Sequence, residues 1–183
     1  IEGNVQRHIE GTAEHSIMYR ALGTEPKTAH PYNLYGDIKS QAQALRDTFK
    51  NNQQVVPAIA QRLTDRGFQG MIGHGLGTSQ FVAQTASAAF WSWAQWDARD
   101  LDSLEYIVQG HPIDFKRNAF FAYSGSGSTI DSNRAALKAK SLGAYQVAFT
   151  SVAGSPITEK CDDAIVCAGG FDTEELGAGA FQL

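Results

Sequence analysis

From residue 37 onward, helix-spaced apolar stripes alternate with short apolar runs of strand length. The first stripe predicts a helix over residues 37–49 and consists of Ile38, Ala42, Leu45 and Phe49. Further stripes predict helices over 55–66, 79–93, 129–142 and 156–160, a short helix starting at 102, and a terminal helix from 174 onward. Apolar runs predict strands over 68–73, 118–123, 145–150 and 164–167, with 94–99 as a less regular candidate.

Strands and helices therefore alternate after a helical lead-in, which predicts an α/β fold with a parallel sheet covered on both faces. Ligands in such sheets bind beyond the carboxyl ends of the strands, where the strand order reverses. Residues 1–36 carry turn formers and few periodic apolar positions, so we expect an irregular arm there and one domain over 37–183. The chain starts at Ile1 and stops inside the terminal helical pattern, so we expect a fragment of a longer polypeptide.

Composition limits the classes of partner. The 183 residues are 43% hydrophobic and 19% charged, as expected for a soluble globular domain. A net charge of −4 without a Lys/Arg block weighs against nucleic acid or an anionic membrane as partner. The apolar runs are too short to span a bilayer, and with no visible signal peptide we expect a cytoplasmic protein. Two cysteines, Cys161 and Cys167, make no disulfide framework, and we expect both to be small buried residues.

Two loops of small residues follow predicted strands and carry the candidate chemistry. The first runs from Gly73 to Ser79 and the second from Ser124 to Thr129. Glycines let the backbone approach an anion, which the N–H groups and dipole of the following helix attract. Hydroxyl groups add donors, while the absence of a Walker lysine in the second loop disfavours a nucleoside triphosphate. The loops predict a site for a small phosphorylated metabolite.

The order and spacing of these loops resemble the sugar isomerase (SIS) domain family. The resemblance begins with Gly77-Thr78-Ser79 and the loop 124–129, and continues through 135–144, 149–151, 155–157, 161–163 and 173–175. It implies a flavodoxin-like three-layer sandwich with a five-stranded parallel sheet, recognition of a phosphosugar without a cofactor, and a homodimer or larger homo-oligomer. The lead-in and first loop look most like the first SIS domain of two-domain enzymes, such as glutamine–fructose-6-phosphate aminotransferases and fructosamine-phosphate deglycases.

By position, the resemblance assigns phosphate binding to residues of both loops. They are Gly77, Thr78, Ser79, Ser124, Ser126, Gly127, Ser128 and Thr129. Gly125 and Ser128 stand where the aminotransferases usually have Gln and Glu, which leaves the identity of the sugar open.

Aldose–ketose isomerisation needs a base that moves a proton between C1 and C2 and an acid for ring opening. The candidates are Glu174, which follows Thr173 as in the Gly-Thr-Glu pattern of the family, Glu105 after the second strand, and His74 in the first loop. Each has an alternative reading: a carboxylate that stabilises a helix dipole, a solvated surface carboxylate, and a packing histidine, respectively. The histidines of the lead-in lack metal-site spacing, and we predict no metal.

Surface and core expectations concern a few further residues. Phe90, Trp91, Trp93 and Trp96 predict an aromatic cluster in the core or at a subunit interface. Asp131 and Asn133 are expected to be exposed.

Two other functions compete with a phosphosugar enzyme. A non-catalytic sugar-phosphate sensor would use the same loops, although the chain shows no basic recognition helix. A dinucleotide-binding oxidoreductase is suggested by the glycines at 73, 75 and 77, but the third comes one position early for the Rossmann fingerprint.

Overall fold

The computed structural model describes residues 29–31 and 33–169. Most of the expected arm, the terminal helix and Glu174 lie outside the described residues. The helices are α2 (Asn33–Asn51), α3 (Val55–Asp65), α4 (Thr78–Ala89), the π-helical turn η1 (Phe90–Ala94), α5 (Ser103–Gln109), α6 (Ile130–Ser141) and α7 (Pro156–Lys160). The strands are β1 (Gly70–Gly75), β2 (Asp97–Asp102), β3 (Asn118–Tyr123), β4 (Gln146–Thr150) and β5 (Asp163–Val166).

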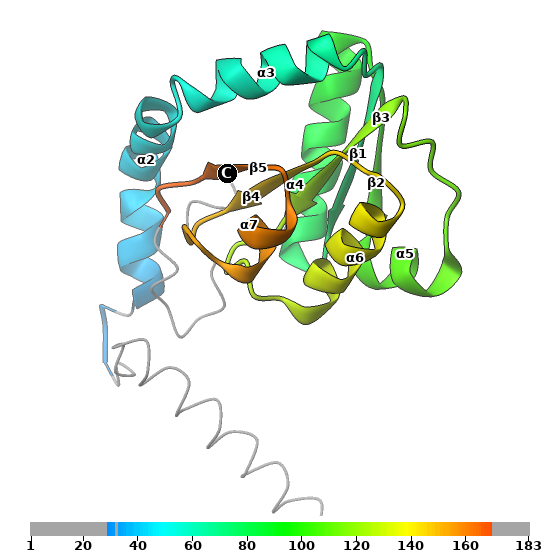
Figure 1. Ribbon diagram of the computed structural model, residues 1–183. Coiled ribbons are helices and arrows are strands. Elements are labelled where there is room, and N and C mark those ends of the chain that lie inside the picture. Colours follow the sequence, from blue (N-terminus) through cyan, green and yellow to red (C-terminus); the bar gives the residue numbers. More distant parts are fainter. Residues whose placement is uncertain (1–28, 32, 170–183) are drawn as a thin grey trace, which may run out of the picture.

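The described strands form one five-stranded sheet in the order β2-β1-β3-β4-β5 (Figure 1). Every neighbouring pair is parallel, as the alternation of strands and helices predicts. The chain moves outward from β1 to β2, then returns to the other side of β1 to form β3. The strand order therefore reverses between β1 and β3, and the expected α/β fold with a five-stranded parallel sheet is confirmed.

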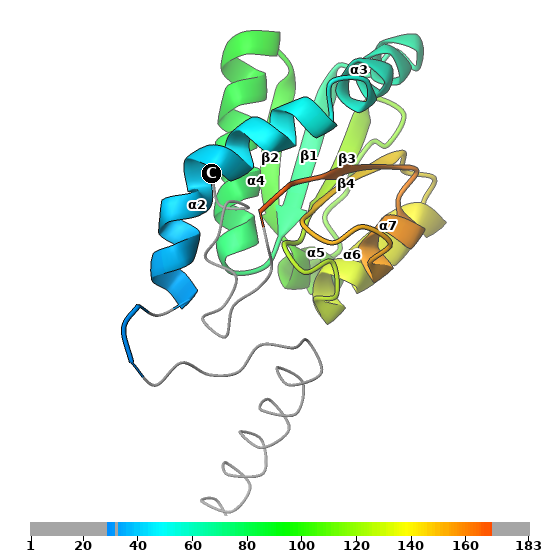
Figure 2. The same cartoon turned by 90° about the vertical axis from the view of Figure 1, so that its left-hand side faces the viewer.

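Helices cover both faces of this sheet, and the central strands are buried on both sides. Met71 and Phe121 point into a core shared with α3 and α4. Their sequence neighbours Ile72 and Phe120 point to the opposite face, into a second core shared with α5 and α6. Figure 2 shows α5, α6 and α7 on one side of the sheet and α4 on the other. A third cluster buries Ile157 of α7 against the sheet.

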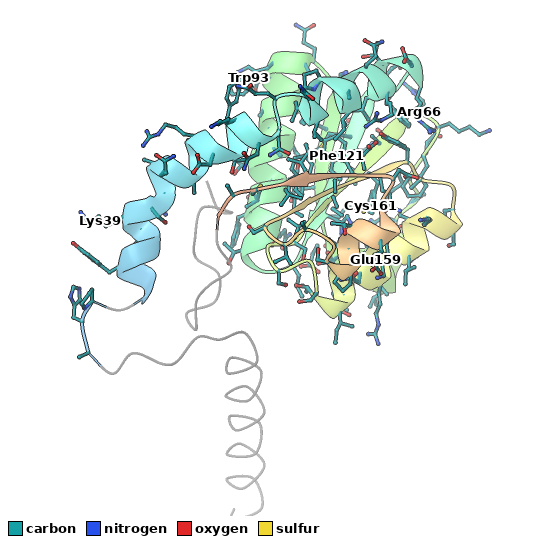
Figure 3. The ribbon with its side chains drawn as sticks, turned by 60° about the vertical axis from the view of Figure 1, so that its left-hand side comes forward. Lys39, Arg66, Trp93, Phe121, Glu159 and Cys161 are labelled. Carbon is teal, nitrogen blue, oxygen red and sulfur yellow. The ribbon has the colours of Figure 1, made fainter. Side chains whose placement is uncertain are left out.

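The second strand differs from the sequence expectation. It occupies Asp97–Asp102 rather than 94–99, because α4 continues into η1 up to Ala94. Gln95 then adopts a left-handed conformation with φ of 56°, which ends the helical path before the strand begins. The aromatic cluster is also divided: Phe90 and Trp96 pack against the core, whereas Trp91 and Trp93 are 68% and 87% exposed. Figure 3 shows Trp93 at the surface and Phe121 inside.

Two further expectations need correction. Asn133 is buried and Asp131 half-buried, rather than exposed; the amide group of Asn133 hydrogen-bonds to backbone carbonyls of the loop before α6. Of the two cysteines, Cys161 is buried and Cys167 is only half-buried. Burial raises the pKa of both thiols, which keeps them in the protonated, poorly nucleophilic form.

Candidate functional site

The first loop is a tight turn between β1 and α4. A Cβ atom at Gly75 would lie 2.5 Å from the backbone carbonyl carbon of Ser79, so only glycine allows the strand to approach the helix this closely. Gly77 has φ of 59° and stands at the N-cap position of α4. Thr78 follows as an exposed residue and Ser79 as a half-buried one, both in the first turn of the helix.

The second loop is held in place by residues that follow β4. Gly125 O accepts a hydrogen bond from Ser151 N at 2.9 Å, and Gly127 O accepts one from Ile157 N at 3.0 Å. Gly127 has φ of 66°, and a Cβ atom there would overlap the Ser155 hydroxyl. Contacts within the protein therefore fix the backbone of the loop.

The hydroxyl groups of the second loop are arranged around Ser126. Its Oγ accepts hydrogen bonds from Ser128 N at 3.2 Å and from Ser128 Oγ at 2.9 Å. Ser128 is exposed, and Ser126 and Thr129 are half-buried. Ser124 lies beneath them, buried, and its Oγ donates to Thr129 Oγ1 at 3.5 Å. Ser126, Ser128 and Thr129 can thus reach a ligand directly, while Ser124 orients Thr129.

The two helices that follow these loops begin without a side-chain cap. Gly77 before α4 has no side chain to offer, and Thr129 before α6 makes no capping hydrogen bond. The helices α3 and α7 also begin without a side-chain cap, whereas α5 is capped by Asp102, whose Oδ1 accepts from Leu104 N at 2.8 Å and Glu105 N at 3.1 Å. Apart from Gln80 N, which donates to Gly77 O at 3.1 Å, the first N–H groups of α4 and α6 lack intrahelical acceptors and can bind an anion. Because β1 and β3 are adjacent, the two helix starts meet at one edge of the sheet.

Comparison with known proteins supports this reading of the fold. No family model matches the chain. The glutamine–fructose-6-phosphate aminotransferase (isomerizing) of Thermococcus kodakarensis is 24% identical over 148 residues. The alignment covers 81% of this chain but only 24% of that relative, so the chain spans about a quarter of its length.

Solved structures agree in architecture. The C-terminal domain of glucosamine-fructose-6-phosphate aminotransferase from Francisella tularensis matches with a TM-score of 0.69 at 18% identity, over 78% of this chain and 41% of that one. Tagatose-6-phosphate ketose/aldose isomerase from Escherichia coli matches with a TM-score of 0.61 at 16% identity, over 79% of this chain and 42% of that one. The NanR protein of Vibrio vulnificus, complexed with ManNAc-6P, matches with a TM-score of 0.60 at 20% identity, over 81% of this chain and 56% of that one. The chain has the fold of a sugar isomerase (SIS) domain.

Within this SIS fold, His74 does not lie in the loop where sequence reasoning placed it. It is the fifth residue of β1 and is fully buried, with its ring stacked on Phe120 at a centroid distance of 4.5 Å. Its Nδ1 lies 3.0 Å from Ser103 Oγ. Burial lowers the pKa of His74 to about 3, so the imidazole is neutral near pH 7. The ring lies beneath the loops rather than at the solvent-facing edge.

Of the two candidate carboxylates, only Glu105 lies among the described residues. Glu105 is exposed in the first turn of α5, with Oε1 3.5 Å from His111 Nε2. Glu174 lies outside the described residues.

Over residues 29–31 and 33–169, no three His, Cys, Asp or Glu side chains are grouped as a metal site requires. None of the helices described combines the length and the apolar character needed to cross a membrane.

Sequence reasoning missed the residues that support the second loop. Thr150 Oγ1 donates to Gly125 O at 3.1 Å, and Asn133 Nδ2 donates to Gly127 O at 3.1 Å. Ser155 lies against Gly127. Thr150 and Ser155 come from β4 and the turn that follows it. Both lie in segments that carry the family resemblance, but no local pattern linked them to the loop.

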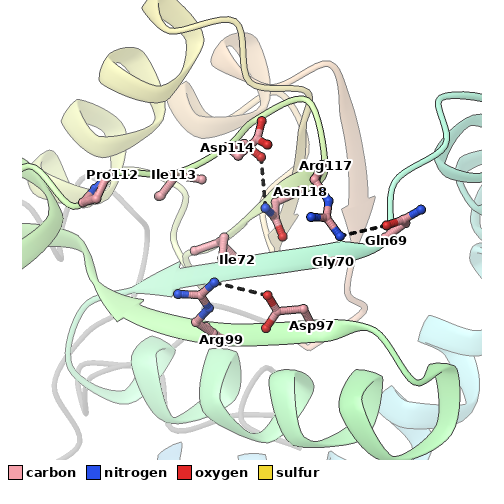
Figure 4. A pocket seen from close by; sticks show the side chains of 10 residues that line it. All are labelled: Gln69, Gly70, Ile72, Asp97, Arg99, Pro112, Ile113, Asp114, Arg117 and Asn118. Carbon is pink, nitrogen blue, oxygen red and sulfur yellow. Dashed lines mark hydrogen bonds and ion pairs between the residues drawn. The ribbon is translucent and has the colours of Figure 1, made fainter.

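A separate cavity of about 230 Å³ lies at the opposite edge of the sheet, where β1, β2 and β3 begin (Figure 4). Its arginines already have partners: Arg99 Nη2 is 3.2 Å from Asp97 Oδ2, and Arg117 Nη2 donates to Gln69 Oε1 at 3.0 Å. This cavity contains none of the loop residues and is distinct from the candidate site.

Proposed function

We propose that this chain is the phosphosugar-binding SIS domain of an enzyme that acts on a hexose 6-phosphate by isomerisation, amination or deglycation. The observation that carries the proposal is the pair of small-residue loops at the carboxyl ends of adjacent strands, each leading into an uncapped helix. Related enzymes of phosphosugar metabolism share the fold.

Neutral donors hold the phosphate group in this proposal. The loops contain no Lys or Arg, so the N–H groups and dipoles of α4 and α6 supply the positive potential. Thr78 and Ser79 add hydroxyl donors from one loop, and Ser126, Ser128 and Thr129 from the other. Gly77 and Gly127 allow the backbone to approach the phosphate oxygens.

The proton transfer between C1 and C2 needs a carboxylate. We propose Glu174 as base, with Glu105 as the second candidate, since Glu105 is exposed and follows β2, the neighbour of β1. The full burial of His74 makes it a poor proton donor to a bound sugar. Because the chain spans about a quarter of its curated relative, further catalytic groups are expected from outside these 183 residues.

We also propose a homodimer or larger homo-oligomer in the cytoplasm. Large apolar side chains remain exposed on α2 and η1, with Phe49 74% and Trp93 87% accessible. Such surfaces are commonly buried between protein chains.

A second candidate is a sugar-phosphate sensor without catalysis. The similarity to NanR, a protein solved with ManNAc-6P, is the observation behind it, although the enzyme structures match over nearly the same share of this chain. Both candidates need the same loops, and turnover separates them: an enzyme converts a phosphosugar, whereas a sensor only binds one.

A thermal-shift panel tests the binding. It uses fructose 6-phosphate, glucose 6-phosphate, glucosamine 6-phosphate, ManNAc-6P, inorganic phosphate and NAD, because a ligand that binds only the folded state raises the melting temperature. We expect a hexose phosphate to stabilise the chain well beyond inorganic phosphate. Stabilisation by NAD alone would refute the proposal in favour of an oxidoreductase.

Paired substitutions locate the binding. Ser124→Ala with Ser126→Ala removes a hydroxyl that orients Thr129 and one that faces the ligand. The Ser126 hydroxyl makes the direct charge-assisted hydrogen bond, which contributes about 1.5–3 kcal/mol, so phosphosugar affinity falls at least about tenfold. Ser141→Ala is the control, because Ser141 lies at the far end of α6 and donates to Lys138 O. Unchanged affinity in the double variant would show that the phosphate binds elsewhere.

A further inference from the structure

Three polar side chains from different segments meet beneath the two loops. His74 of β1 lies 3.0 Å from Ser103 of α5, measured from Nδ1 to Oγ. Ser103 Oγ in turn lies 3.3 Å from Ser132 Oγ of α6. His74 and Ser103 are 0% exposed and Ser132 is 1% exposed, so no solvent replaces these hydrogen bonds.

This buried row ends at the helix start that the proposed function requires. Ser132 is the third residue of α6, within the turn whose first N–H groups face the second loop. The next residue, Asn133, donates from Nδ2 to Gly127 O at 3.1 Å and to Thr129 O at 2.9 Å. The first turn of α6 is therefore tied to the second loop through Asn133 and to the end of β1 through Ser132.

We propose that His74 is a positioning residue that fixes the first turn of α6 relative to the first loop through Ser103 and Ser132. The proposal rests on the proposed phosphosugar function, since it concerns the geometry of that site. In this role His74 does not transfer a proton. It aligns the donors of the first loop with those of the second loop, so that both can bind the same anion.

The chemistry of the row suits this role. A neutral imidazole is both a donor and an acceptor, so His74 and the two hydroxyls can bond in sequence without burying a charge. The ring is also fixed by its stacking on Phe120 at 4.5 Å. An aliphatic residue at position 74 would leave Ser103 with one partner fewer in a dry environment, where an unsatisfied polar group is costly.

Two substitutions at position 74 separate hydrogen bonding from packing. His74→Phe keeps a ring that can stack on Phe120 but removes the hydrogen bond to Ser103. His74→Asn loses the ring but keeps an amide atom near the position of Nδ1. Ser132→Ala breaks the other end of the row, and Ser87→Ala is its matched control. Ser87 is also a buried helical serine, but it contacts Met71 on the opposite face of β1.

Fructose 6-phosphate affinity and melting temperature are measured for each variant of the full chain. We expect His74→Phe and Ser132→Ala to weaken binding about tenfold, and His74→Asn and Ser87→Ala to bind within about twofold of the wild type. If affinity instead falls in parallel with the melting temperature, so that His74→Asn binds more weakly than His74→Phe, then His74 is only a packing residue. In the complete enzyme, loss of turnover without loss of affinity in both His74→Phe and His74→Asn would return His74 to proton transfer. Either result overturns the proposal.

Amide hydrogen exchange of residues 127–132 separates this inference from the proposed function. If the wild type binds no hexose phosphate, the proposed function fails, but the row can still be tested without ligand. Faster exchange in His74→Phe than in His74→Asn would then support the positioning role. Equal exchange in the two variants would refute it.

Discussion

The buried histidine makes a quantitative prediction about acid stability. In the folded protein, burial lowers the pKa of His74 from its ordinary 6.5 to about 3. Between these two values the unfolded chain binds a proton at this position and the folded chain does not. The stability that depends on neutral His74 is therefore complete above about pH 6.5 and is lost progressively as the pH falls toward 3.

The size of the effect follows from the shift. Each pKa unit corresponds to about 1.4 kcal/mol, so the difference between 6.5 and about 3 amounts to about 5 kcal/mol once the pH lies below both values. At pH 4.5, about two units below the unfolded value, the loss is about 3 kcal/mol. This is a large fraction of the 5–15 kcal/mol by which typical domains are stable. His74→Phe cannot bind the proton and should lack this component.

Urea unfolding at pH 7 and pH 4.5 measures the difference. The free energy of unfolding of the wild type should fall by about 3 kcal/mol more than that of His74→Phe over this interval. All other titrating groups are common to the two proteins, so their contributions cancel in the comparison. An equal fall in the two proteins would refute the claim that His74 is buried in its neutral form.

Three further predictions concern the loops and the chemistry. Gly127→Ala should lower the melting temperature and abolish fructose 6-phosphate binding. The reason is that φ of 66° is strained for alanine and the new Cβ overlaps Ser155. Normal binding in a calorimetric titration would contradict the loop geometry. Asp102→Ala should cost about 1 kcal/mol in urea unfolding through loss of the α5 cap, and an unchanged free energy of unfolding would contradict that role of Asp102. In the complete enzyme, Glu174→Gln should lower kcat far more than it raises KM; an unchanged kcat would transfer the base role to Glu105 or to a residue beyond this chain.

Much of the fold could be predicted from apolar periodicity because each element has a local signature. The strand at Asn118–Tyr123 and the helix at Pro156–Lys160 have the predicted bounds, since continuous apolar residues and Pro at a helix start are visible without tertiary context. The glycines of both loops were equally visible, because positive φ and close backbone approach leave few other choices. The edge strand β2 was misplaced, because the exposed Asp97 and Arg99 give it no apolar run.

The order of strands and helices, the position of the two loops and the resemblance to an SIS domain can all be recognised from local sequence. The contacts beneath the loops follow only from how the elements pack. His74 is buried because β1 is a central strand covered on both faces, and Asn133 because the loop carbonyls fold back onto α6. The row of His74, Ser103 and Ser132 joins residues 29 positions apart at each step. Such contacts depend on how the elements pack against one another, and the apolar periodicity within each element does not determine that packing.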